Sequence, residues 1–110
     1  MRKLVIAIYL LAWTSLIDAN IASDILSSRT PDQQSQILSN IVNSAGEPCI
    51  PTQAFYQGID LYGAAYWDVA CADGRAFVIQ ISNNAAATTT IIRCSAMKSL
   101  GAECFRMFGR

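Results

Sequence analysis

AYWDVACADGRAFVIQIS, residues 65–82, is the stretch that decides the fold. Apolar side chains alternate with others on both sides of the ADG tripeptide, which is the pattern of two strands with one buried face each. A three-residue turn with a left-handed glycine, Ala72-Asp73-Gly74, keeps the apolar residues on one face, whereas a two-residue turn would mix the faces. Asp68 is then expected to face water. The predicted facing pairs are Val69 with Phe77, Trp67 with Ile79, and Tyr66 with Gln80.

Two further strands extend this hairpin into a meander. The first of them is expected at an edge of the sheet, because Pro51 has no N–H to donate to a central ladder. The last strand is expected to turn Thr90 and Ile92 inward, and Gly101 is expected near the end of a final helical turn. The predicted elements are strands at about 50–57, 65–71, 75–82 and 88–94, followed by a short helical turn at 95–101.

A helix is predicted over residues 31–45. Thr30 suits its N-cap and Pro31 its first turn. Its apolar residues fall on one stripe, whereas residues 20–29 carry only a weak helical signal. The predicted fold class is therefore α+β, with one N-terminal amphipathic helix packed on a four-stranded antiparallel meander. The expected core consists of Ile37, Leu38, Ile41, Val42, Trp67, Val69, Phe77, Ile79, Ile81 and Ile92.

The N-terminus has the pattern of a signal peptide. Arg2 and Lys3 precede an uncharged apolar run at 4–17, which is shorter than the roughly 20 residues that a membrane-spanning helix needs. We expect a signal peptide at 1–19, with cleavage as late as residue 22 or an uncleaved anchor as the alternatives. The remaining residues, 20–110, are expected to form one small domain that is exported to the periplasm or secreted.

The four cysteines are predicted to form disulfides, because an even number of cysteines in a small exported chain is typical of disulfide-bonded proteins. No Cys-x-x-Cys motif and no histidine is present, which argues against zinc and against a dithiol redox centre. The meander brings all four cysteines to one end and leaves their connectivity open. A middle strand would hold Cys71 and Cys94 roughly 10 Å apart. This favours the pairs Cys49–Cys71 and Cys94–Cys104.

The C-terminal half resembles a group of small exported bacterial proteins. The resemblance rests on YWDVACADGR at 66–75, on Cys94 and on the closing Glu103-Cys104-Phe105, and it covers roughly residues 49–105. The shared pattern is an aromatic strand that ends in Cys-x-Asp-Gly, a second strand, and two cysteines about ten positions apart. The group has no established activity, so the resemblance implies export and disulfide bonds but no catalytic residue.

The composition argues against an enzyme. Of the 110 residues, 53% are hydrophobic, and eight basic residues balance eight acidic ones. This excludes a highly charged disordered chain and gives no general attraction to nucleic acid. Histidine, the commonest general base, is absent. The nearest set of carboxylates is Asp60, Asp68 and Asp73, but the last two are already explained by the solvent-facing strand positions and the turn. We expect no catalytic residue, no metal and no cofactor.

Aromatic residues around the loop at 58–63 are typical of recognition surfaces. The expected contacts with another protein are Phe55, Tyr62 and Tyr66, with Arg75 and Arg106 as secondary electrostatic contacts. Residues 20–70 carry one basic and five acidic residues, whereas residues 71–110 carry five basic and two acidic ones. The apolar tail at 105–108 is expected to cover the sheet's open edge or second face.

The predicted function is a non-enzymatic protein-binding module, for example an accessory subunit of a membrane-associated periplasmic complex. The alternatives are a secreted inhibitor or effector, a structural envelope protein and, least favoured, an enzyme that works without histidine. Nucleic acid is not an expected partner. Contact with a membrane is expected only if the N-terminal segment is retained or the basic end docks on it.

Overall fold

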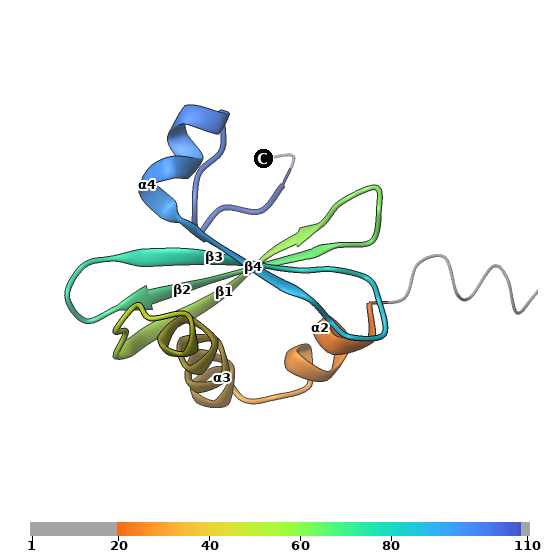
Figure 1. The fold of residues 1–110 in the computed structure, drawn as a ribbon, viewed down its shortest axis with the longest axis horizontal. Helices are drawn as coiled ribbons and strands as arrows, with labels where there is room; N and C mark the ends of the chain where they lie inside the picture. Colours follow the sequence, from red (N-terminus) through yellow and green to blue (C-terminus); the bar gives the residue numbers. More distant parts are fainter. Residues whose placement is uncertain (1–19, 109–110) are drawn as a thin grey trace, which may run out of the picture.

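The computed structural model describes residues 20–108, so the signal-peptide prediction lies outside the described residues. An antiparallel four-stranded sheet in the order β1-β2-β3-β4 forms the centre of the domain, and helices pack against it (Figure 1). The fold is therefore α+β, as predicted. The elements are α2 at Ile21–Ser27, α3 at Pro31–Ser44, β1 at Pro51–Ile59, β2 at Ala65–Cys71, β3 at Ala76–Ile81, β4 at Thr89–Arg93, α4 at Cys94–Met97 and the 3-10 helix η1 at Lys98–Leu100.

The central hairpin has the predicted register. The Cys71 N–H donates to the Arg75 carbonyl over 2.8 Å, which leaves a three-residue turn between them. Gly74 has a φ of +90°, a left-handed conformation that glycine adopts without strain. The predicted facing pairs Val69–Phe77, Trp67–Ile79 and Tyr66–Gln80 are all present.

Helix α3 forms where the capping pattern predicted it. The Gln33 N–H donates to the Thr30 hydroxyl, and the Thr30 N–H donates to the Gln33 side chain, so the two form a capping box. Leu38 and Val42 on its inner stripe are fully buried against the sheet. Ile37 was expected in the core, but it is 38% exposed because it lies at the margin of that stripe.

Helix α2 is a second N-terminal helix that the weak signal at 20–29 did not establish. Its Leu26 joins the core, and the Trp67 indole N–H donates to the Ser23 hydroxyl over 3.0 Å. The buried Asn20 caps the helix by accepting from the Ser23 N–H. The Asn20 amide also donates to the Gly63 and Ile81 carbonyls over 2.8 and 3.0 Å. One side chain thus ties the residue before α2 to the loop between β1 and β2 and to the end of β3.

The face of the sheet opposite α3 differs from the prediction. Asp68 was expected to face water, but it is fully buried, because the C-terminal segment at 103–108 covers this face. Thr90 and Ile92 were expected to point towards the helix core. Ile92 pairs with Val78 and Thr90 with Gln80, which places both on the opposite face, and Ile91 contacts the helix core in their place. The predicted alternation of side chains in β4 was wrong by one residue, because the length of the loop before β4 does not determine which of its residues face the helices.

Both disulfides have the predicted pairing. Cys49 bonds to Cys71, which joins the segment before β1 to the end of β2. Cys94 bonds to Cys104, which joins the end of β4 to the C-terminal segment. The short helical turn that was predicted between Cys94 and Cys104 is formed by α4 and η1, and Gly101 ends it in a left-handed conformation. The second bond therefore fixes the point from which the C-terminal segment crosses the sheet.

Candidate partner-contact surface

The turn between β1 and β2 is built around the side chain of Asp60. One carboxylate oxygen, Oδ1, accepts from the N–H groups of Tyr62 and Ala64 over 2.9 and 3.0 Å. The other oxygen accepts from the Tyr66 hydroxyl over 2.8 Å, and that hydroxyl accepts from the Gln80 amide. Burial alone would raise the pKa of Asp60, but these donors outweigh it and lower the pKa. The carboxylate therefore stays charged and holds the turn in one conformation.

This turn presents apolar side chains to solvent. Leu61 is fully exposed and Tyr62 is 89% exposed, while Ile59 at the end of β1 is partly exposed. Two large apolar residues side by side in the sequence, on a turn that is braced from within, form a projecting apolar tip. We call Ile59, Leu61 and Tyr62 the apolar tip. Tyr62 was predicted from the sequence as a contact residue, but the role of Asp60 in the turn was not. The sequence does contain a signal for that role, because an aspartate side chain often accepts a hydrogen bond from the backbone N–H two residues later.

Phe55 and Tyr66, the other two aromatic residues expected at the contact, pack against the C-terminal segment. The Phe55 and Phe105 ring centroids are 6.1 Å apart, and the Tyr66 and Phe108 rings meet edge to face at 5.1 Å. The absence of a side chain at Gly58 permits this approach, because a Cβ there would lie 2.8 Å from the Phe108 ring. The prediction that the apolar tail covers the second sheet face is therefore confirmed.

Polar groups hold the same segment in place. The Phe105 N–H donates to Asp68 Oδ2 over 2.6 Å. The Gln57 amide donates to the carbonyls of Glu103 and Arg106 over 2.8 and 3.1 Å. Burial raises the pKa of Asp68 to about 7, and the bond from Phe105 only partly offsets this rise. We call this set of contacts, made by Gln57 and Asp68 with residues 103–106, the polar latch.

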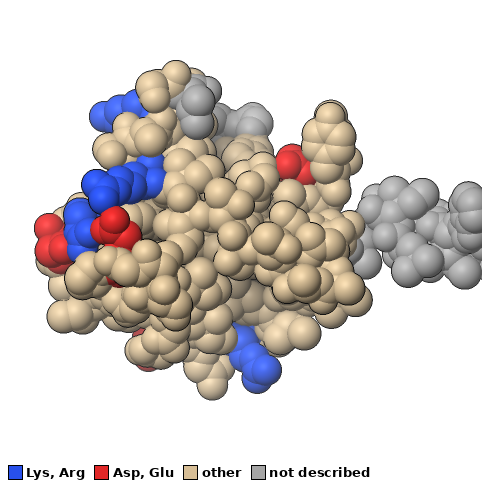
Figure 2. Space-filling model, viewed as in Figure 1, with Lys and Arg blue, Asp and Glu red and all other residues tan. Residues whose placement is uncertain are grey.

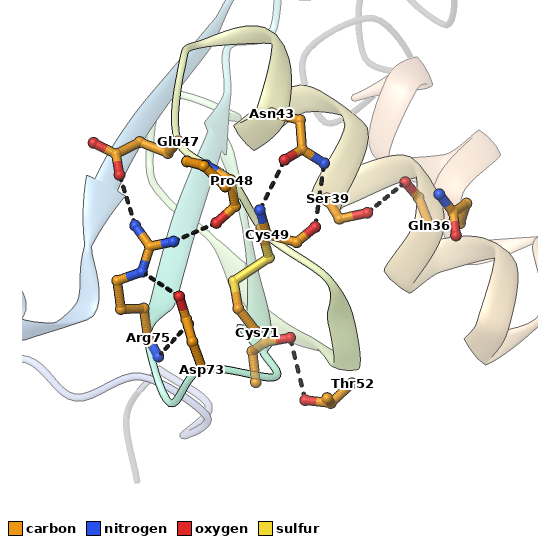
Figure 3. The surroundings of a disulfide bond; sticks show 11 residues. Gln36, Ser39, Asn43, Glu47, Pro48, Cys49, Thr52, Cys71, Asp73 and Arg75 are labelled. Carbon is orange, nitrogen blue, oxygen red and sulfur yellow. Dashed lines mark hydrogen bonds and ion pairs between the residues drawn. A yellow bond between two sulfur atoms is a disulfide. The ribbon is translucent and has the colours of Figure 1, made fainter.

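Arg75 lies at the opposite end of the sheet, beside the Cys49–Cys71 disulfide (Figure 3). Its guanidinium donates to Glu47 and to Asp73, each over 2.8 Å, and to the Pro48 carbonyl. Arg93 adds a second ion pair to Glu47 over 2.7 Å. Arg75 therefore joins the turn after β2 to the segment before β1, with its charge matched by neighbouring acids.

Charged side chains gather near this end of the face drawn in Figure 2, while the middle of that face is uncharged. Arg106, the other basic residue expected at a contact, is exposed and forms one long ion pair of 3.4 Å to Glu103. The two arginines thus differ. Arg75 is part of an internal cross-link, whereas the guanidinium of Arg106 extends into solvent.

The structure does not bring the three candidate carboxylates to one site. Asp60 and Asp73 lie beyond opposite ends of β2, and Asp68 is buried in the middle of that strand. Among residues 20–108, no three residues of the metal-binding types histidine, cysteine, aspartate and glutamate cluster closely enough to hold a metal ion. Each of the three carboxylates instead has a local role in a turn or in the polar latch.

Comparisons with protein families, with curated proteins and with solved structures give no match to this chain. The resemblance to small exported bacterial proteins therefore remains a prediction. None of the helices between residues 20 and 108 combines the length and the apolar character needed to cross a bilayer.

Proposed function

We propose that this chain is a small exported protein-binding module without catalytic activity, and that the apolar tip is the centre of its contact surface. One observation carries the proposal: Leu61 and Tyr62 are almost completely exposed on a turn whose backbone is hydrogen-bonded to Asp60. A turn that is ordered before binding loses little backbone entropy when a partner covers it, and tyrosine is among the residues that dominate binding energy at many interfaces.

The two disulfides support the exported location, because such bonds form and persist in oxidising compartments. Tyr66 supports the tip through its hydrogen bond to Asp60, whereas Phe55 lies in the middle of β1 and packs on the C-terminal segment. Arg106 offers a secondary electrostatic contact, while the contribution of Arg75 is limited by its ion pairs with Glu47 and Asp73. The class of partner that fits best is a protein with an apolar recess, including a subunit of a membrane-associated periplasmic complex.

The test is affinity isolation of the tagged, full-length protein from detergent-solubilised membranes of its own cell, with mass spectrometry of what is recovered. We expect a partner whose recovery falls at least tenfold with Leu61→Ala or Tyr62→Ala. Ile50→Ala is the matched control, because Ile50 is also an exposed apolar residue, at 74%, but lies at the other end of β1. Equal recovery with all three variants, or no partner other than the chain itself, would refute the proposal.

A secreted inhibitor is the second candidate, favoured by the rigidity of the same turn. An inhibitor would insert the apolar tip into the recess of an enzyme and would block that enzyme's activity when added as a purified protein. An accessory subunit would co-purify with its complex and leave the activity intact. The activity of the recovered partner, measured with and without added protein, separates the two candidates.

A further inference from the structure

The two edges of the sheet differ in how far they are protected. On the outer side of β1, Pro51 has no N–H, the pairing with β2 is irregular at two places, and the Phe108 N–H donates to the Gln57 carbonyl over 3.0 Å. These features block the addition of another strand. β4 has none of them: its pairing with β3 is regular over its whole length, and its sequence is Thr-Thr-Ile-Ile-Arg.

The backbone of β4 offers hydrogen bonds at this open edge. The Ser82 N–H donates to the Thr88 carbonyl over 2.9 Å, so residues 88, 90 and 92 bond to β3 in the alternating antiparallel pattern. The N–H and carbonyl groups of Thr89 and Ile91, and the N–H of Arg93, therefore point away from β3. In Figure 1, β4 crosses in front of the other strands, which leaves this edge towards the viewer.

An apolar groove runs beside the open edge. It has a volume of about 730 Å³ and lies between α3 and β4, with Ile37, Ile41 and Ile91 among its lining residues. It exists because α3 packs mainly on β1 and β2, which leaves the β4 side of the same face less covered. The side of the molecule drawn in Figure 2 carries no charged side chain in its middle.

We propose that β4 is an interface at which two copies of this chain join edge to edge across a two-fold axis at Ile91. In this register Ile91 faces Ile91 of the second copy, and Arg93 faces Thr89 of the second copy. The outward N–H of each Ile91 then meets the carbonyl of the other, and each Arg93 N–H meets a Thr89 carbonyl. The two sheets become one continuous sheet, and the contact is isologous because both copies use the same strand.

Several features favour a second copy as the occupant of this edge. The only charged residue of the strand is Arg93, which is ion-paired with Glu47 of its own copy, and the two-fold register keeps the two Arg93 side chains apart by placing each opposite a threonine. The β-branched residues that fill the strand pair well across antiparallel strands. The isoleucines of the groove give the added strand an apolar surface on the α3 side.

The test is the molar mass of the purified, exported and oxidised protein, measured by light scattering over a dilution series. We expect a monomer–dimer equilibrium that responds to charge at position 89. Thr89→Glu places a carboxylate opposite Arg93 of the second copy and should tighten the dimer. Thr89→Lys places like charges there and should weaken it. Because Glu47 already pairs with Arg93, each change is expected to alter the Kd by about threefold.

Gln53→Glu and Gln53→Lys are the matched controls, because Gln53 is an exposed residue of the protected strand β1. Neither control should alter the Kd. Thr89 is also exposed, so its variants should keep the fold, which far-UV circular dichroism will check. A wild-type chain that is monomeric at every concentration would overturn the proposal and would indicate that a different protein binds in the groove. A dimer whose Kd changes equally with Glu and with Lys at position 89 would also overturn it. The apolar tip is unchanged in all these variants, so the result is independent of the proposed function.

Discussion

The two faces of the sheet are covered in different ways. On one face, two helices bury a continuous apolar cluster that includes Trp67, Phe77 and Ile79. On the other face, a short C-terminal segment lies over Asp68 and Gln57 and is held by the polar latch, by two aromatic contacts and by the Cys94–Cys104 disulfide. We call these the helix face and the latch face.

The difference shows that the two faces of one sheet can be stabilised by different kinds of interaction. The helix face is stabilised by removal of apolar surface from water, which depends little on pH. The latch face depends on a buried carboxyl group, so its stability should respond to pH. Each face also has one disulfide, Cys49–Cys71 in the helix core and Cys94–Cys104 at the start of the latch segment. Four predictions test this contrast.

The largest effect is expected on the helix face. Phe77→Ala removes a side chain that is only 1% exposed and should lower the free energy of unfolding by about 3–5 kcal/mol. Phe108→Ala on the latch face is the control, because Phe108 is 42% exposed, and it should cost about 1 kcal/mol. Urea denaturation of both variants at pH 5 and pH 8 measures this. Equal losses of unfolding free energy in the two variants would contradict the proposed difference between the two faces.

The second prediction concerns pH. The pKa of Asp68 is about 7 in the folded state and near 3.8 in the unfolded chain, so the folded state holds a proton that the unfolded state has lost. The stability due to this carboxyl is complete below about pH 4 and disappears as the pH rises through 7. Between pH 5 and pH 8 the free energy of unfolding should fall by about 3 kcal/mol.

Asp68→Asn should abolish that slope. Asp73→Asn is its control, because Asp73 is an exposed carboxylate whose pKa is lowered by hydrogen bonds from the Arg75 backbone and side chain. Urea denaturation at several pH values would show a flat profile for Asp68→Asn and a wild-type profile for Asp73→Asn. A wild-type slope in Asp68→Asn would assign the pH dependence to another group.

The third prediction compares the disulfides. The two bonds join cysteines 22 and 10 positions apart, but the entropy of loop closure grows only with the logarithm of loop length. Replacement of either pair by alanines should therefore cost about 3 kcal/mol. Only the loss of Cys94–Cys104 should release the C-terminal segment and speed hydrogen exchange at the Phe105 N–H. Unchanged exchange there, measured by NMR, would mean that the polar latch and the aromatic contacts hold the segment without the covalent anchor.

The smallest effect is expected at Glu47. Hydrogen bonding to Arg93, followed by the charges of both arginines, lowers the pKa of Glu47, although partial desolvation opposes this. The contribution of Glu47 to the free energy of unfolding is therefore present above the usual glutamate pKa and is lost as the pH falls below it. This is the opposite direction to Asp68. Glu47→Gln should cause a small loss at pH 7 that added salt removes, because the ion pairs are exposed. A loss that persists in high salt would indicate a buried role.

The helix face could be predicted from the sequence in more detail than the latch face. The apolar tail was expected to cover the open edge or the second face of the sheet, but the burial of Asp68 beneath it was not expected. Alternation along β2 and β3 and the left-handed glycine at 74 determine the hairpin register, and convergence of the strand ends favours the disulfide pairs. Asp68 was misassigned because alternation shows only that it lies opposite Trp67 and Val69. The burial of Asp68 depends on residues 103–108, whose sequence shows neither the apolar repeat of a helix nor that of a strand and so does not indicate where the segment lies.

The candidate site was predicted in part for the same reason. Tyr62 is exposed as the loop composition suggested, whereas Phe55 and Tyr66 are partly covered by a segment far away in the sequence. The ion pairs of Arg75 with Glu47 and Asp73 depend on tertiary contacts that charge counting does not reveal. Whether Tyr62 and Arg106 bind a partner remains a prediction.

The position of Asn20 bears on how the precursor would be matured. A cut after Ala22 would remove the residue that bridges the β1–β2 loop and the end of β3, and it would leave the Gly63 and Ile81 carbonyls without their amide donor. A cut after Ala19 would place the new amino group directly on Asn20 and keep both bonds. We therefore predict that the exported form begins at Asn20, and its intact mass would test this.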